Sequence, residues 1–165
     1  MSPLDDKPST SVTQHLWFEK DMEAAIRFYT DLIPGSSISW ISALPAESPS
    51  GPANSVRLAG FTLGDQRYQA IEAGPLDPFN HSFSIMLTCD DQPEIDRLWE
   101  ALKQGGSVEQ CGWLRDRWGL SWQIVPRRLG ALMSDPDPDK ARRVAEAMLG
   151  MVKFDIAGLE AAAAG

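Results

Sequence analysis

The chain is poor in the residues that most often carry metal or nucleophilic chemistry. Its 165 residues include two cysteines, Cys89 and Cys111, and two histidines, His15 and His81. The cysteines form no close-spaced pair, which argues against a disulfide framework or a zinc motif and favours reduced thiols. Cys89 ends an apolar run and is expected to be a small buried hydrophobe. No neighbouring His or Arg is placed to activate Cys111.

Positive charge and long apolar runs are scarce as well. Fifteen Lys and Arg against 23 Asp and Glu give a formal net charge of −8, which argues against a nucleic-acid partner. No apolar run approaches the length of a membrane span, so no membrane partner is expected. Residues 1–11 are polar and lack the features of a signal peptide, which predicts a disordered tail on a cytoplasmic protein.

What the chain does contain is one pattern that occurs twice. Apolar runs at 12–18 and 82–89 precede Asp21 and Asp91, which lie 70 positions apart (91 − 21). Each aspartate is expected to cap an amphipathic helix, the second one with Glu94 completing a capping box. Strands follow each helix, and in the first half they are expected at 37–44, 56–63 and 67–73. The repeat predicts two βαβββ modules, each of which buries one face of its sheet.

The last part of the chain reads as helical. The proline-rich run 135–139 starts an amphipathic stripe, which consists of Ala141, Val144, Ala145, Met148 and Leu149. This stripe could bury itself on its own chain or pair with a second copy. We expect a tail at 1–11, paired modules at 12–134 (12–75 and 80–126), and a helical extension at 135–165.

The run 110–126, Gln-Cys-Gly-Trp-Leu-Arg-Asp-Arg-Trp-Gly-Leu-Ser-Trp-Gln-Ile-Val-Pro, predicts a hairpin. It resembles the last hairpin of the PhnB-like family of the vicinal-oxygen-chelate (glyoxalase/bleomycin-resistance) superfamily. Segments 16–18, 24–29, 64–66, 96–102 and 135–138 are similar to the same family. The resemblance implies an α+β glyoxalase/dihydroxybiphenyl dioxygenase-like fold, with two βαβββ modules, C-terminal helices and a sheet that cups a pocket.

Strand alternation within that fold defines the expected ligand pocket. The residues expected to face it are Gln14, Leu16, Phe18, Gln69, Ile71, Ser84, Met86, Trp113 and Gln123. His15, Trp17 and Trp122 are expected on the helix side.

The resemblance also bears on the chemistry of the pocket. Metal-dependent members of the superfamily place metal ligands at the positions of Gln14, Gln69, Ser84 and Gln123. Amides and a hydroxyl are poor ligands for a divalent ion, so neither a metal nor another cofactor is expected. The same groups could also simply hydrogen-bond one another in a wet cavity. No catalytic residue can be identified.

Several functions stay open at this point. The first is a metal-independent protein that binds or converts a small molecule in the pocket. The second is a sequestration module of the antibiotic-resistance type, and the third is a dimerising scaffold. The family label, 3-demethylubiquinone-9 3-methyltransferase, implies methyl transfer, but the chain has no glycine-rich cofactor loop after its first strand. A homodimer is expected in each case.

Overall fold

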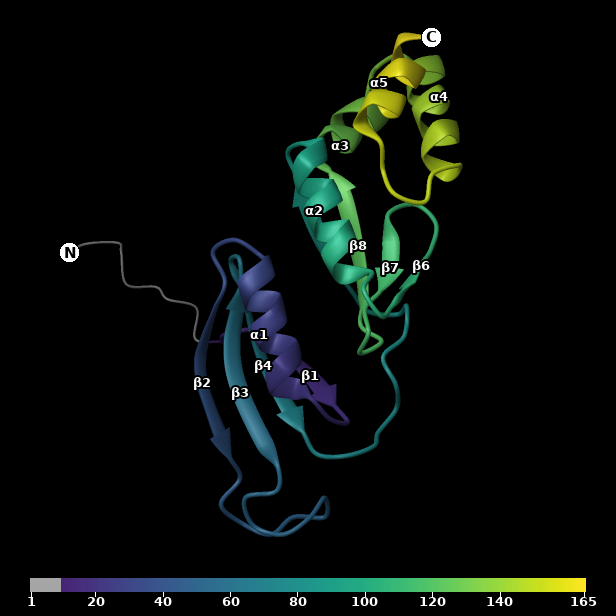
Figure 1. Cartoon of the computed structure of the whole chain (residues 1–165). Coiled ribbons are helices and arrows are strands. Elements are labelled where there is room, and N and C mark those ends of the chain that lie inside the picture. The colour runs from purple at the N-terminus through teal and green to yellow at the C-terminus, as the bar shows by residue number, and fades with distance from the viewer. Residues whose placement is uncertain (1–9) are drawn as a thin grey trace, which may run out of the picture. The chain divides into compact units, whose positions relative to one another are not determined.

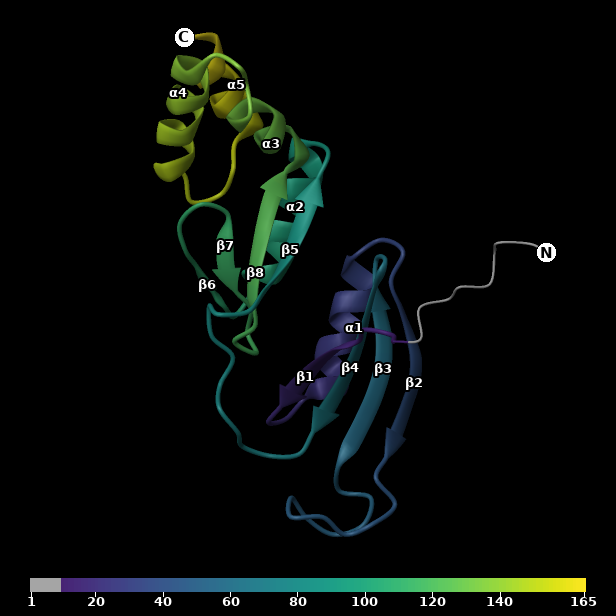
Figure 2. The ribbon, with the colours of Figure 1, turned by 180° about the vertical axis from the view of Figure 1, so that it is seen from behind.

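The computed structural model describes residues 10–165, so most of the expected tail lies outside the described residues. The chain divides into two compact units, the first ending at Asp77 and the second beginning at Pro78 (Figure 1). Each unit contains a four-stranded mixed sheet with a helix on one face. Figure 2 shows the opposite face of each sheet. The predicted pair of βαβββ modules with C-terminal helices is confirmed.

In the first unit, the first strand lies at the edge of the sheet and pairs with the last strand of the module. The elements are β1 Gln14–Phe18, α1 Met22–Leu32, β2 Ser37–Ala43, β3 Arg57–Leu63 and β4 Gln66–Glu72. The sheet order is β1-β4-β3-β2, in which β1 and β4 are parallel and the other neighbours are antiparallel. Side chains from α1 and from one sheet face form the core, and they include Leu16, Phe18, Met22, Ile26, Tyr29, Phe61 and Tyr68.

The second unit repeats this topology, with a shorter second and third strand. Its elements are β5 Ser84–Cys89, α2 Gln92–Leu102, β6 Ser107–Val108, β7 Trp113–Arg115 and β8 Ser121–Pro126. The sheet order is β5-β8-β7-β6, and β5 and β8 are parallel. The core beneath α2 includes Ile85, Ile95, Leu98, Trp99, Leu102, Leu114, Trp122 and Ile124.

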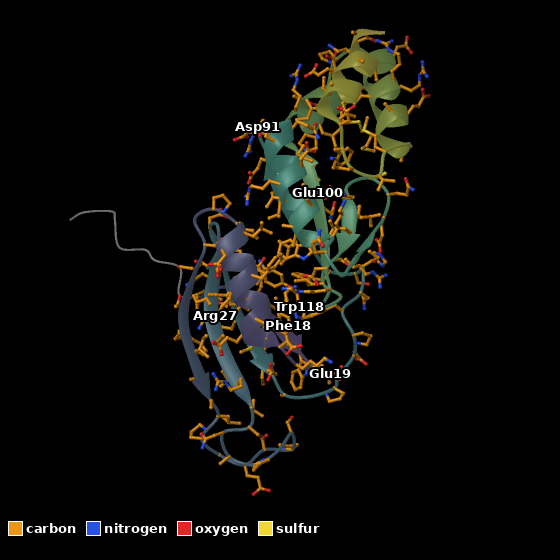
Figure 3. The ribbon with its side chains drawn as sticks, in the orientation of Figure 1. Phe18, Glu19, Arg27, Asp91, Glu100 and Trp118 are labelled. Carbon is orange, nitrogen blue, oxygen red and sulfur yellow. The ribbon has the colours of Figure 1, made fainter. Side chains whose placement is uncertain are left out.

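The two sheet-covering helices begin in different ways. At α2, the Asp91 carboxylate accepts a 3.0 Å hydrogen bond from the Glu94 amide, as predicted. Figure 3 labels Asp91 at the start of this helix. The Glu94 carboxylate pairs with Arg97 at 2.6 Å and does not complete the capping box. At α1, Asp21 has a left-handed backbone (φ 60°) and its side chain caps nothing. The prediction for Asp21 is wrong: the Met22 amide donates to the Glu72 carboxylate at 2.8 Å.

The C-terminal extension consists of three helices. These are α3 Arg127–Met133, α4 Pro138–Leu149 and α5 Ile156–Ala164. The sequence did not predict α3, because it starts directly after β8 without a capping side chain and contains a glycine. The helices enclose a small core of their own, made of Leu132, Val144, Phe154, Leu159 and Ala163.

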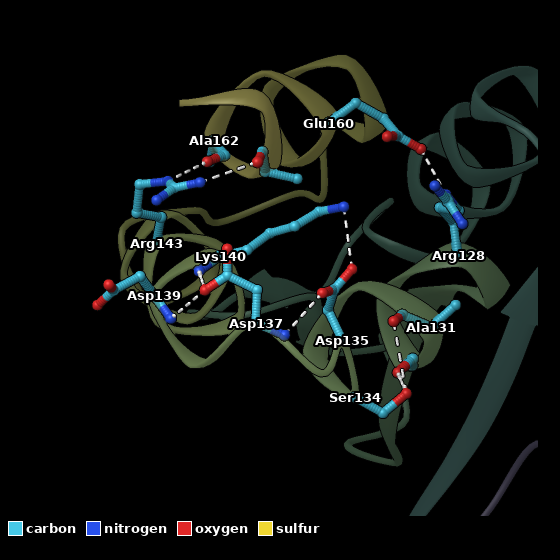
Figure 4. Close-up of polar contacts among 12 residues, drawn as sticks. Arg128, Ala131, Ser134, Asp135, Asp137, Asp139, Lys140, Arg143, Glu160 and Ala162 are labelled. Carbon is cyan, nitrogen blue, oxygen red and sulfur yellow. Dashed lines mark hydrogen bonds and ion pairs between the residues drawn. The ribbon is translucent and has the colours of Figure 1, made fainter.

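Polar contacts tie these helices to one another (Figure 4). Arg128 pairs with Glu160 at 2.6 Å, and Lys140 pairs with Asp135 at 2.9 Å. Arg143 donates to the carbonyl of Ala162 at the end of α5, at 3.0 Å. The extension is therefore a folded part of the second unit.

Hydrogen bonds join the extension to the rest of the second unit. The amides of Cys111 and Gly112 donate to the carbonyls of Met151 and Val152, at 2.8 and 2.7 Å. The Gln92 side chain donates to the Phe154 carbonyl and accepts from the Ile156 amide, at 2.9 Å each. Of the two outcomes left open for the α4 stripe, the structure shows burial on its own chain, with Val144 fully buried. Among residues 10–165, no helix is long and apolar enough to cross a membrane.

Candidate functional site

The faces of the first sheet are opposite to those predicted for β1. Leu16 is paired with Ala70, and both are buried on the face that α1 covers. Because side chains alternate along a strand, Gln14 and Phe18 share that face. The prediction that Gln14, Leu16 and Phe18 face a ligand is therefore corrected. The same register places His15 and Trp17 on the uncovered face.

A row of residues crosses the uncovered face of the first sheet. His15 lies opposite Gln69, Gln69 opposite Gly60, and Gly60 opposite Trp40. The Trp40 indole lies directly over Gly60, where a Cβ atom would come within 2.3 Å of its Nε1. A side chain at position 60 would displace the ring, so the glycine is required for this packing. The structure thus joins the predicted Gln69 with His15, which had been assigned to the opposite face.

The faces predicted for the second sheet agree with its register. We define the second open face as six side chains of β5, β8 and β7 that point away from α2: Ser84, Met86, Trp113, Arg115, Ser121 and Gln123. Gln123 lies opposite both Met86 and Trp113, and its Nε2 donates to Ser84 Oγ at 2.9 Å. The predicted residues of this half are therefore brought together on one surface.

Two features bound this surface along β8. Val125, on the same side of the strand as Gln123, packs against the core of the C-terminal extension. Ser121, on the other side of Gln123 along the strand, is fully buried, and its hydroxyl has no hydrogen-bond partner within the described residues. A buried polar group without a partner is uncommon in folded proteins.

A charged cluster that the sequence did not predict borders the second open face. Arg115 Nε donates to Glu109 Oε1 at 3.1 Å, and Arg115 Nη2 lies 2.7 Å from His81 Nδ1. His81 Nε2 lies 2.5 Å from Glu109 Oε2, and its ring centroid is 6.1 Å from that of Trp113. Strand alternation with Trp113 could have predicted that Arg115 lies on this face. No local pattern predicts its partners His81 and Glu109, which lie in two loops.

Asp116 is a charged residue at the turn of the hairpin in the run 110–126, and its contacts show its structural role. Its carboxylate is buried and accepts hydrogen bonds from the amides of Trp118 and Leu120, at 2.9 and 3.1 Å. It also accepts from the Trp122 indole at 2.9 Å. Trp122 is fully buried on the α2 side, as predicted. Asp116 therefore fixes the turn and does not belong to the open face.

The residues described here offer no cluster of three or more His, Cys, Asp or Glu side chains that could hold a metal ion. Cys89 is buried, and burial, together with the nearby Glu94 and Asp90 carboxylates, raises the pKa of its thiol to about 11. It is a protonated, unreactive thiol at neutral pH. Cys111 lies against the C-terminal extension, with its Sγ 3.6 Å from the Met148 carbonyl.

Comparison with known proteins adds three similarities. A PhnB protein from Bacillus cereus, named after 3-demethylubiquinone-9 3-methyltransferase, is 32% identical over 71% of this chain and 99% of its own, with a TM-score of 0.61. Protein PA1353 from Pseudomonas aeruginosa is 25% identical over 72% of this chain and 98% of its own, with a TM-score of 0.55.

The fosfomycin resistance protein FosX from Listeria monocytogenes, complexed with Mn(II) and sulfate, shares the fold alone. It is 13% identical over 70% of this chain and 90% of its own, with a TM-score of 0.50. No curated protein matches the chain. The family model of 3-demethylubiquinone-9 3-methyltransferase matches residues 10–125. This chain therefore belongs to the PhnB-like, 3-demethylubiquinone-9 3-methyltransferase family and has a glyoxalase-like fold.

Proposed function

We propose that this protein binds a small organic molecule on the second open face and needs no metal to do so. The observation that carries the proposal is the concentration of polar side chains on a sheet face that α2 does not cover. A sheet face that is merely exposed to solvent does not require a hydrogen bond between a Gln and a Ser side chain at its centre. A binding surface, in contrast, uses a few oriented polar groups among apolar ones.

The arrangement of the face suits recognition of a ligand. Gln123 uses its Nε2 to bond Ser84, which holds the amide in one orientation and leaves its Oε1 to accept a hydrogen bond. Trp113 and Met86 lie opposite Gln123 on the two neighbouring strands. Apolar contact area therefore flanks an oriented polar group on both sides.

Of the nine residues expected in a pocket, the proposed site keeps Ser84, Met86, Trp113 and Gln123. Gln69 and Ile71 stay candidates on the uncovered face of the first sheet, beside His15 and Trp17. Gln14, Leu16 and Phe18 are no longer proposed, because they lie on the face that α1 covers.

Methyl transfer, which the family description names, has less support. The connection from β1 to α1 is Glu19-Lys20-Asp21, and it has no glycine that would let a cofactor approach the backbone. Sequestration without reaction and conversion of the ligand both remain compatible with binding on the second open face. Turnover of the bound molecule would separate them.

Native mass spectrometry of freshly purified protein tests binding and metal content together. We expect a co-purified or added small molecule and no stoichiometric divalent ion. A divalent ion that survives mild chelation would contradict the metal-independent part of the proposal, and S-adenosylmethionine bound with micromolar affinity would favour methyl transfer.

The residue-level test is Gln123→Leu, with Gln104→Leu in the exposed turn after α2 as the matched control. Gln123→Leu should abolish the thermal shift produced by the ligand, while the free energy of unfolding changes by less than about 1 kcal/mol. The control should keep the ligand-induced shift. A loss of several kcal/mol in stability with binding intact would show that Gln123 serves packing alone.

A further inference from the structure

We propose that the ligand of the second open face is an organic oxyanion, a carboxylate or phosphonate with an apolar body, whose head is bound by Ser121, Ser84 and Arg115. The inference rests on the proposed function, because it names the chemical class that this face recognises. Three observations carry it: an unpaired buried hydroxyl, a set of converging donors, and a guanidinium held in place by its neighbours.

The first observation is the Ser121 hydroxyl. Its side chain is fully buried and has no partner among the described residues. Alternation with Trp122, which points toward α2, directs Ser121 to the second open face. A hydroxyl that is removed from water without a hydrogen bond destabilises the fold, so an alanine would be the more stable choice at this position unless something binds the hydroxyl.

The second observation is the kind of hydrogen-bonding group around Ser121. Ser121 lies opposite Ser84 on β5 and opposite Arg115 on β7. Ser84 Oγ already accepts from Gln123, so its O–H is left to donate. Two hydroxyls and one guanidinium are therefore adjacent on one face. This set is rich in donors, which matches the oxygens of an anion better than a neutral or cationic group.

The third observation is the position of the Arg115 side chain. Glu109 and His81 bond its Nε and Nη2, which leaves the N–H groups of Nη1 for a ligand. A guanidinium fixed in this way loses little conformational entropy when it binds an oxyanion. The Glu109 carboxylate also offsets part of the Arg115 charge, so a singly charged carboxylate should bind better than a doubly charged phosphonate.

The apolar body follows from the neighbours of Gln123. Trp113 is half-buried, and Met86 is 55% exposed although it is a large apolar residue. Both lie opposite Gln123, which is two residues from Ser121 along β8. A planar or aliphatic group attached to the oxyanion would cover Met86 and contact the Trp113 ring.

The test uses four probes on the full-length protein, with affinities from calorimetry and with amide and indole NMR signals to locate the site. Benzoate and phenylphosphonate present both a head and a body, inorganic phosphate presents the head alone, and benzamide presents a neutral analogue. We expect benzoate to bind most tightly, phenylphosphonate less tightly, and phosphate and benzamide at least tenfold more weakly than benzoate. The Trp113 indole signal should shift on benzoate binding.

Two variants and one control locate the interaction. Ser121→Ala should weaken benzoate about fivefold, as expected for one lost hydrogen bond, while the protein becomes no less stable. Arg115→Gln should weaken benzoate tenfold or more. Arg142→Gln, an equal change of charge on the exposed face of α4, should leave the affinity unchanged.

The outcomes separate the two proposals. If benzamide binds the second open face as tightly as benzoate, the oxyanion inference is wrong and the proposed function stands. If benzoate binds Ser121→Ala as tightly as it binds the unchanged protein, the role of the buried hydroxyl is wrong, even where Arg115→Gln fails to fold. If no probe shifts any signal of this face and native mass spectrometry finds no bound molecule, both proposals are wrong.

Discussion

Asp116 is a single carboxylate on which a whole hairpin depends. It is 3% exposed and accepts hydrogen bonds from two backbone amides and one indole, which come from the turn and from β8. Replacing it with asparagine turns one acceptor oxygen into an NH₂ donor that faces N–H groups. The turn would then contain at least one unpaired buried donor.

We expect Asp116→Asn to lower the free energy of unfolding by about 3 kcal/mol. Urea denaturation measures the change, and Asp65→Asn, at the exposed turn between β3 and β4, is the control. A loss below about 1 kcal/mol for Asp116→Asn would show that the turn holds without the carboxylate.

Cys89 provides a prediction about reactivity. Burial and the neighbouring carboxylates raise the pKa of its thiol to about 11, so almost no thiolate exists at pH 8. Iodoacetamide should therefore leave Cys89 unmodified in the native protein and alkylate it fully in urea, as read by peptide mass spectrometry. Rapid native labelling of Cys89 would mean that β5 opens on the timescale of the reaction.

Among the elements, β1 and β8 show what a strand sequence can and cannot reveal. In β8, polar Ser121 and Gln123 alternate with Trp122 and Ile124, so only one assignment of faces buries the large side chains. In β1, residues 16–18 are three consecutive apolar side chains, and alternation alone is consistent with either assignment. The pairing with β4, 54 positions later (68 − 14), decides the faces of β1, and no local pattern contains that information.

The start of α1 is a second case in which a distant residue replaces a local one. Asp21 occupies the expected N-cap position, but its backbone is left-handed (φ 60°) and its side chain makes no cap hydrogen bond. Glu72, at the end of β4, supplies the missing acceptor. The sequence therefore located the helix correctly and misidentified its cap.

This arrangement predicts opposite effects at the two positions. Glu72→Gln should destabilise the protein by about 1 kcal/mol, because a charged acceptor at a helix start is lost. Asp21→Gly should stabilise it by about 0.5–1 kcal/mol, because glycine adopts positive φ without strain. Thermal and urea unfolding of both variants provides the measurement, and a destabilising Asp21→Gly would mean that the Asp21 side chain has a role of its own.

For the molecule as a whole, one ion pair within the extension and one between the extension and α2 predict a response to acid. The Lys153 ammonium, followed by the Gln92 amide, lowers the pKa of Asp96, and Arg128 lowers the pKa of Glu160. A lowered carboxyl pKa means that the folded state binds its proton less readily than the unfolded chain. The stabilisation is then present above the ordinary pKa, near pH 4, and is lost as the pH falls below it.

Comparing Lys153→Met with the unchanged protein isolates this contribution. The variant should be less stable at pH 7, and the difference in urea midpoint should shrink toward zero at pH 3. Lys103→Met, which removes an exposed pair with Glu100 on α2, controls for the loss of a surface lysine. A difference that persists unchanged at pH 3 would rule out the Asp96 pair as its source.

Self-association stays a prediction, although most of the surface expected to form the interface packs within the protein's own chain. The α4 stripe was the expected interface, but Val144 and Met148 pack within the extension, while Leu149 remains 64% exposed. Deleting residues 135–165 would now expose the core of the extension and cause aggregation whether or not the protein dimerises. Sedimentation of the full-length chain at micromolar concentration is the decisive measurement, and a monomer there would refute the dimer.

Each sheet is completed by a parallel pair between the first and last strands of its module, β1 with β4 and β5 with β8. During synthesis, β1 leaves the ribosome dozens of residues before β4, with which it pairs, so the first unit gains its full sheet only when β4 emerges. Such distant pairings raise contact order and slow folding. The nascent chain therefore carries an unpaired apolar strand for seconds at ordinary rates of translation, which makes early recognition by chaperones a consequence of its topology.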